Sequence, residues 1–290
     1  MRYYIPDIKL ASELPQQKKF QEKLGGIPWG LSEKEWPKCK ECHKSQSLLA
    51  QFLHHPERMD LGKEGRVLNI FMCNQNVGGC SSWDAESGAN ACFVTESEEM
   101  QKGLSTIPAD NPPIEKEARI TKWKEKEDKI SEKDAKAFYN DKYYDLEEEK
   151  ISKVSSITRL GGVPSWIQTP ADAPARAIFI GQLSTHYNFF KAPKEINKIP
   201  EPQPPEIPQK TKKRSIVRKL FSFFRRSKKS KTAPTPMPAY DPNAIYEHKK
   251  VVDGCTHYTE GPNFGDCGMG YIFIKKSKGK PKGYFFWQCS

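Results

Sequence analysis

The sequence predicts two related halves, each mostly β with few helices, and three observations support this prediction. A short glycine-containing motif occurs twice, apolar runs bounded by glycine and proline recur along the chain, and two charged segments separate them. We expect a first half at residues 1–104, a charged helical connector at 105–156 and a second half at 157–290 that is interrupted by a flexible basic insert at 191–250. A chain of 290 residues is long enough for this arrangement.

The repeat is the strongest of these observations. Leu24–Trp29 (LGGIPW) recurs as Leu160–Trp166 (LGGVPSW). Each copy follows a basic residue and precedes an apolar stretch that contains one glutamine: Lys23 and Gln51 in the first copy, Arg159 and Gln182 in the second. Because these landmarks keep their order, we expect Gln51 and Gln182 to occupy equivalent strands.

Apolar β-branched or aromatic runs predict strands at 66–72, 177–183, 270–275 and 284–288. The connector has a different pattern of apolar and charged residues. Between Ile114 and Tyr139 the chain is densely charged, and apolar residues such as Ile120 and Trp123 recur at nearly helical spacing. This pattern predicts one or two exposed helices packed on the body by a thin apolar stripe.

The insert holds the whole charge excess of the chain. Residues 210–231 contain eleven of the 47 lysines and arginines and no acid, which leaves 47 − 11 = 36 basic residues against 36 acidic ones. Prolines cluster on both sides, which favours an extended, solvated tether. Any function that depends on net positive charge is therefore expected in this segment.

Within the insert, Arg214–Arg226 predicts an amphipathic helix that binds an anionic surface, with the inner face of the membrane preferred over nucleic acid. Its apolar stripe includes Phe221 and Phe224. The cations that border the stripe are Arg214, Arg218, Lys219, Arg225 and Arg226. Two other interpretations stay open: nucleic-acid binding by charge alone, and a solvated charge run without a partner.

Four cysteines in two close pairs predict a structural zinc site in the first half. Cys39 and Cys42 form a C-x-x-C turn, and Cys73 and Cys80 follow a predicted strand across a glycine turn. Two turns that each supply two thiolates suit tetrahedral zinc, although the second spacing is wider than usual. The alternative is four reduced thiols. His43 could replace one ligand, and Cys92 is a further candidate.

Catalytic motifs are weak, so we expect no enzyme. His55-Pro56-Glu57 resembles the H-x-E of zinc deaminases, but it follows the C-x-x-C turn instead of preceding it. A zinc hydrolase is therefore the least favoured alternative. The sequence contains neither a phosphate-binding loop nor a G-x-S-x-G elbow. No signal peptide is evident at the N-terminus, and we expect a cytoplasmic protein, peripheral to the membrane where the insert binds it.

These landmarks resemble the YwqG-like family of bacterial proteins, which is related to the eukaryotic programmed-cell-death-2 proteins. The resemblance includes both glycine motifs, the cysteine turn, and the final aromatic run Phe286–Ser290. It implies an α+β fold: duplicated, mainly antiparallel β halves with peripheral helices. The eukaryotic relatives resemble chaperones for a ribosomal protein, and some bacterial members resemble immunity proteins of toxin loci. The long insert departs from the family pattern.

The expected function is that of a non-catalytic protein- or peptide-binding adaptor, either a client chaperone or an immunity-type protein. A groove between the halves would accept the client, and strand edges could pair with it. Trp29, Trp83 and Trp166 are the candidate partner contacts because each lies beside a glycine turn. The alternative is that these tryptophans fill the cores.

Overall fold

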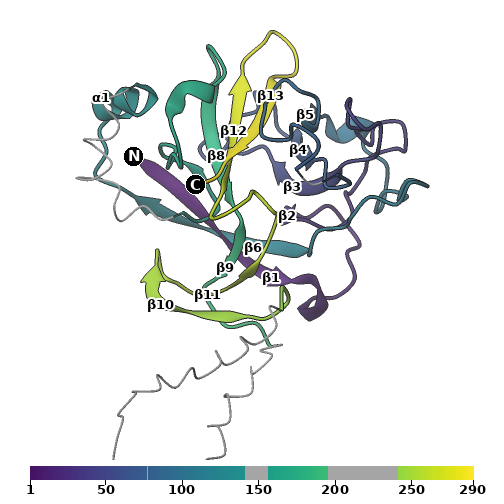
Figure 1. Cartoon of the computed structure of the whole chain (residues 1–290), viewed down its shortest axis with the longest axis horizontal. Coiled ribbons are helices and arrows are strands. Elements are labelled where there is room, and N and C mark those ends of the chain that lie inside the picture. The colour runs from purple at the N-terminus through teal and green to yellow at the C-terminus, as the bar shows by residue number, and fades with distance from the viewer. Residues whose placement is uncertain (77, 141–155, 195–240) are drawn as a thin grey trace, which may run out of the picture.

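Strands dominate the computed structural model, which describes residues 1–76, 78–140, 156–194 and 241–290 (Figure 1). The strands are β1 Arg2–Leu10, β2 Lys23–Leu24, β3 Ser47–Leu53, β4 Val67–Met72, β5 Asn90–Thr95, β6 Ala118–Glu127, β7 Arg159–Gly161, β8 Ile178–Ser184, β9 His186–Phe189, β10 Tyr246–Val252, β11 Cys255–Glu260, β12 Met269–Lys275 and β13 Lys282–Gln288. The four runs predicted as strands are confirmed as β4, β8, β12 and β13.

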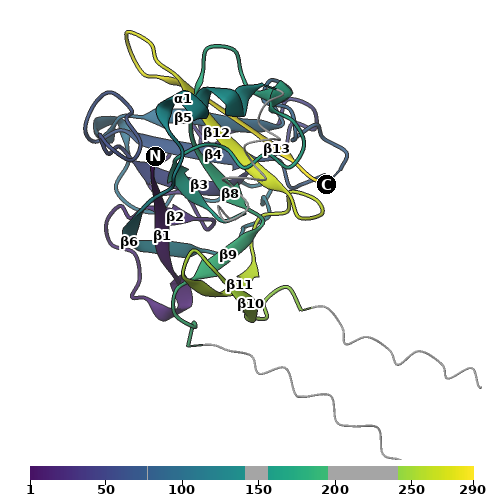
Figure 2. The same cartoon turned by 90° about the vertical axis from the view of Figure 1, so that its left-hand side faces the viewer.

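Ten of these strands form one antiparallel sheet in the order β13-β12-β8-β7-β1-β6-β2-β3-β4-β5. β1 and β6 lie at its centre. The first half continues outward from β6 as β2, β3, β4 and β5, and the second half continues outward from β1 as β7, β8, β12 and β13. The remaining strands form a smaller sheet, β10-β11-β9, which lies beyond one end of the large sheet (Figures 1 and 2). Both repeat copies therefore build a single sheet around two central strands.

The two copies match in register as well as in order. Lys23 pairs with Gln51 between β2 and β3, and Arg159 pairs with Gln182 between β7 and β8. The register of pairing with the next strand outward also shifts at the same place in each copy. The shift lies between Leu48 and Ala50 of β3, and in β8 it lies opposite Ile272 and Phe273 of β12. Gln51 and Gln182 thus hold corresponding positions, as the repeat predicts.

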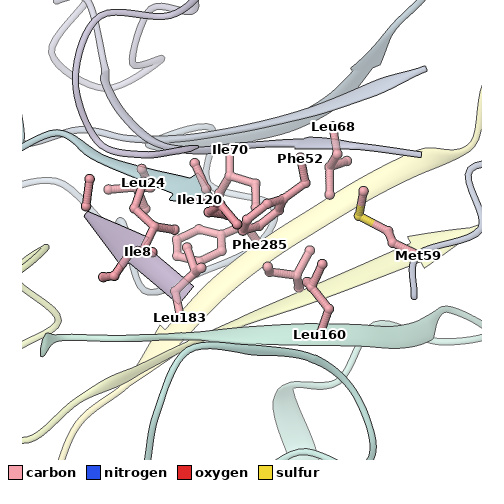
Figure 3. Packing of buried hydrophobic residues seen from close by; sticks show 14 of the residues in the cluster. Ile8, Leu24, Phe52, Met59, Leu68, Ile70, Ile120, Leu160, Leu183 and Phe285 are labelled. Atoms are coloured by element: carbon pink, nitrogen blue, oxygen red, sulfur yellow. The ribbon is translucent and has the colours of Figure 1, made fainter. Parts of the chain in front are cut away.

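The large sheet curls until its two end strands meet. β5 and β13 approach so closely that a Cβ atom on Gly283 would lie 2.5 Å from the Cys92 sulfur, so this seam requires glycine. The curled sheet is nearly closed around an apolar core. Figure 3 shows Phe285 inside it, with Leu68 and Ile70 on one wall and Leu160 and Leu183 on the opposite wall.

A second core packs on the outer face of the second half. Its residues include Trp166, Tyr271, Phe273 and Phe286, all of which are buried. Phe138, from the segment after β6, is also fully buried here, and its carbonyl accepts a hydrogen bond from the Trp166 indole at 2.7 Å. The described part of the connector therefore covers this outer cluster through Phe138.

The expected α+β class with peripheral helices is wrong. Strands hold 38% of the described residues and helices 7%, so the fold is mostly antiparallel β. The described helical segments are short: α1 Glu132–Ala135 and the 3-10 turns Ala11–Glu13, Ser97–Glu99, Lys136–Tyr139 and Pro170–Asp172. None of the helices in the described ranges is long and apolar enough to cross a membrane.

The error has a specific source in the connector, where β6 replaces the predicted helix. Ile8 pairs with Ile120 and Asp7 pairs with Lys122, so Thr121 is an extra residue in β6. This bulge changes the alternation of side chains, and Ile120 and Trp123 both reach the inner core. A bulged strand thus reproduces the i, i+3 spacing that is otherwise typical of a helix.

The basic insert joins β9 to β10 in the small sheet. Its predicted range of 191–250 is too long at the C-terminal end, because Tyr246–Val252 forms β10. The anion-binding candidates Arg214, Arg218, Lys219, Phe221, Phe224, Arg225 and Arg226 lie outside the described residues. The predicted membrane or nucleic-acid contact therefore stays a prediction.

Candidate metal centre and binding groove

Cys39, Cys42, Cys73 and Cys80 converge into one cluster, with all four sulfurs within 4.8 Å of one another. The first two lie in the turn before β3, Cys73 follows β4 directly, and Cys80 lies in the loop toward β5. Three of the four are buried and Cys42 is half-buried. The pairing that the sequence indicates is therefore realised in space, and the cluster could hold a metal ion.

Backbone hydrogen bonds fix the thiol positions. The Cys39 amide donates to the Lys44 carbonyl at 2.8 Å, and the His43 amide donates back to the Cys39 carbonyl at 2.9 Å. On the other side, the Cys73 amide donates to Ala89 at 2.8 Å. These bonds close the first turn and tie Cys73 to the residue before β5, so backbone contacts position both thiols.

The geometry and chemistry of the cluster fit a tetrahedral metal. Sulfurs bound to zinc at about 2.3 Å lie about 3.8 Å apart in a tetrahedron. The Cys42 and Cys73 sulfurs are 3.5 Å apart, so only small shifts are needed. Burial raises the pKa of Cys73 to about 11 and also raises the pKa of Cys80. A bound cation would reverse this tendency by stabilising the thiolates.

Cys42 differs from its neighbours. Burial acts to raise its pKa, but hydrogen bonds from the Lys44 backbone and the neighbouring thiols outweigh burial and lower it. The two substitutes considered from the sequence are not members of the cluster: the metal-ligand group in the described residues contains neither His43 nor Cys92. Cys92 lies in β5 at the seam with β13, where burial raises its pKa.

The loop after Cys80 carries Trp83 and is braced by the cysteine turn. Both carboxylate oxygens of Glu41, between Cys39 and Cys42, accept from the Ser81 amide at 3.0 and 3.1 Å. From β5, the side-chain amide of Asn90 donates to the backbone carbonyls of Ser82 and Asp84 at 3.0 and 2.9 Å. The cluster and this loop therefore form one local unit.

Beside this unit lies a groove of about 590 Å³. Trp83 forms part of it, is 48% exposed, and meets Trp287 of β13 edge to face at 6.4 Å. The other lining residues come from the same loop, from the segment 168–174 and from the end of β13: Asp84, Ala85, Glu86, Gln168, Asp172, Pro174, Phe286, Gln288 and Cys289. The groove thus lies between segments of the two repeat halves.

The three tryptophans predicted as partner contacts lie in three different environments. Trp83 lines the groove. Trp29 is half-buried and lines a different hollow of about 1060 Å³ with Lys18, Lys102 and Leu104. Trp166 is only 4% exposed and lies in the outer core, so it corresponds to the alternative interpretation of a packing residue.

Sequence reasoning did not assign Trp287, Gln288 or Asp172 to a site. Gln288 donates to Asp172 at 2.9 Å, and its side-chain oxygen accepts from the Gln168 amide at 3.1 Å. The final aromatic run was visible as a strand, but its neighbours depend on how the curled sheet brings β13 to the loop after Cys80. No local pattern signals that approach.

Comparison with known families and proteins gives one match. No curated protein matches the sequence. The family model described as Domain of unknown function (DUF1963) matches residues 22–289, which includes both repeat motifs, the four cysteines and the groove. This chain belongs to the DUF1963 family.

Proposed function

We propose that this protein is a non-catalytic protein- or peptide-binding adaptor whose four-cysteine cluster holds a structural zinc ion. The observation that carries the proposal is the groove between the two halves, one wall of which is the Trp83 loop next to the cysteine cluster. A half-exposed tryptophan in a concave site is a common anchor for a binding partner.

Zinc is the metal that best suits four thiolates in two turns. Such a shell leaves no position for water, whereas a hydrolytic zinc needs one. The H-x-E residues do not add to the cluster. His55 accepts from the amides of Glu57 and Arg58 at 3.3 Å each within its own turn. This arrangement favours a metal that stabilises the loop over one that activates water.

The resemblance of the chain to YwqG-like proteins implies the same class of function. YwqG-like proteins carry the DUF1963 domain, and the resemblance of this chain to them implies binding of a protein client, as a chaperone or as an immunity protein. Reduced thiols are maintained in the cytoplasm, where we expect this protein to act. The groove would then be the client site and the metal its support.

Site-specific photo-crosslinking in the native cell tests the proposal. A benzophenone amino acid at position 168 places the probe in the groove, because Gln168 is exposed and lines it. The matched control is the same probe at Ile114, which is 42% exposed and lies outside the groove. Adaptor function predicts discrete protein adducts from position 168 that are absent from position 114. Identical patterns, or adducts from neither position, would contradict it.

A further inference from the structure

The charge of the groove indicates what kind of side chain it accepts. Asp84, Glu86 and Asp172 are exposed and line it, and its lining contains no lysine or arginine. In the part of the chain that the structure describes, no ion pair neutralises any of these three carboxylates. Carboxylates elsewhere are commonly paired, as Asp60 is with Lys276 at 3.1 Å and Glu96 with Arg66 at 3.0 Å. The groove therefore presents negative charge that no basic residue of its lining offsets.

Two of these carboxylates are held in place by the protein. Asp84 accepts from the Glu86 amide at 2.8 Å, and Ser87 donates to the Asp84 carbonyl at 3.1 Å. Across the groove, Asp172 accepts from Gln288, which is only 3% exposed. Both carboxylates are therefore preorganised, which lowers the entropy cost of binding a cation.

The aromatic wall suits the same ligand. The indole nitrogen of Trp287 donates to the Ser82 hydroxyl at 3.2 Å, which orients its ring edge-on to Trp83 with an interplanar angle of 89°. Trp83 remains half-exposed in this arrangement. The face of an indole attracts a guanidinium or ammonium group, and carboxylates beside it add Coulomb attraction.

We propose that the groove binds a lysine or arginine side chain of a partner polypeptide, with the cation on the face of Trp83 and the carboxylates of Asp84, Glu86 and Asp172 around it. This inference rests on the proposed adaptor function and assigns its client class as a basic peptide segment. Outside residues 210–231 the chain is formally neutral, so the carboxylates of the groove set the local field and attract a cationic peptide.

Fluorescence anisotropy with the full-length protein tests the assignment. The probe is a labelled glycine-spaced peptide that carries lysine and arginine, and its partner probe has glutamine at those positions. We expect the cationic probe to bind and Asp84→Asn with Glu86→Gln to weaken it by about tenfold. Trp83→Ala should weaken it roughly 2- to 5-fold, as expected for an exposed cation–π contact. The matched control, Glu33→Gln with Glu64→Gln, removes two exposed carboxylates elsewhere and should leave affinity unchanged.

Three results would overturn the inference. If both probes bind equally and Trp83→Ala weakens both, the groove binds peptides without a preference for cations, and only the client class is wrong. If the cationic probe does not bind while position 168 still crosslinks to partners in cells, the adaptor proposal survives without this ligand. If purified protein with the probe at 168 crosslinks to its own residues 195–240, the occupant is this chain's basic segment and not a partner.

Discussion

Gln51 and Gln182 make the same hydrogen bond in the two repeat halves. The side-chain oxygen of Gln51 accepts from the Trp29 amide at 2.7 Å, and that of Gln182 accepts from the Ser165 amide at 3.1 Å. Both side chains are fully buried. Each glutamine therefore secures the exit of its Leu-Gly-Gly-x-Pro loop to the neighbouring strand.

Replacing either glutamine with leucine should destabilise the protein by a similar amount. Gln51→Leu leaves the Trp29 amide and the Asn69 side chain without this buried partner, at a cost of about 2–3 kcal/mol in the free energy of unfolding. Chemical denaturation measures the change. Gln101→Leu, at an exposed position, is the control and should stay within about 0.5 kcal/mol of the wild type. A neutral Gln182→Leu would contradict the equivalence.

Glu115 should make the protein less stable as pH rises. Burial raises its pKa to about 7, against a smaller opposing effect of the hydrogen bond from Asn74 at 2.5 Å. Between pH 4.5 and pH 7 the folded protein holds a proton that the unfolded chain has released, so the stability present below pH 4.5 is lost as pH rises through 7. Glu115→Gln should therefore stabilise the fold at pH 8 by about 2 kcal/mol and have little effect near pH 4.5.

The neighbouring Glu117 provides a control of opposite sign. It contacts the fully buried Lys23 at 3.3 Å and Arg119 at 2.7 Å. Glu117→Gln removes the charge that compensates Lys23 and should cost at least about 2 kcal/mol at both pH values. Denaturation curves of the two variants at pH 4.5 and pH 8 distinguish them. If both variants change the free energy of unfolding in the same direction at both pH values, the burial of Glu115 does not shift its pKa.

Glu41→Ala should loosen the Trp83 loop without disturbing the four-cysteine cluster. The variant deletes both hydrogen bonds to the Ser81 amide but leaves the four sulfurs in place. We expect faster amide exchange over residues 81–88 and a global cost below about 1 kcal/mol, because the bonds are exposed. Hydrogen–deuterium exchange measures the local effect. Glu33→Ala is the control, and equal exchange in both variants would contradict the bracing role.

Purified protein should contain one zinc ion per chain, and Cys39→Ser should abolish this content. Because a structural zinc contributes directly to folding, the melting temperature should fall by more than about 5 °C. Elemental analysis and thermal denaturation provide the two readouts. Cys267→Ser is the matched control, since Cys267 is exposed and outside the cluster. Metal-free protein with an unchanged melting temperature in Cys39→Ser would refute the zinc site.

Local sequence patterns predict the structural features that depend only on residues near one another in the chain. The glycine turns and the main strands follow from residue type, and the cysteine pairs follow from their spacing. The helix predicted around Ile120 and Trp123 failed because the bulge at Thr121 depends on pairing with β1, which lies far away in the sequence. Pairing with a distant strand changed the interpretation of an otherwise clear pattern.

The groove could not be predicted for a related reason. Trp83 was selected from its place beside a glycine turn, but Trp287 meets it only because the curled sheet brings β13 next to β5. Trp166 has the same local context, and there the surrounding aromatic residues enclose it. Whether a tryptophan stays exposed or fills a core depends on which distant segments pack around it, which no short window of sequence contains.

The central position of β1 has a consequence for how the protein folds. Tyr3 pairs with Lys126 in β6 and with Gly161 in β7, so β1 can be completed only when strands from far along the chain lie on both sides of it. The seam forms later still, when β13 reaches β5. Contacts between such distant residues carry a high loop-closure entropy and slow the folding of β proteins. The first of these strands in chain order lies in the middle of the finished sheet, and neither the centre nor the seam is complete until strands from distant parts of the chain have come together.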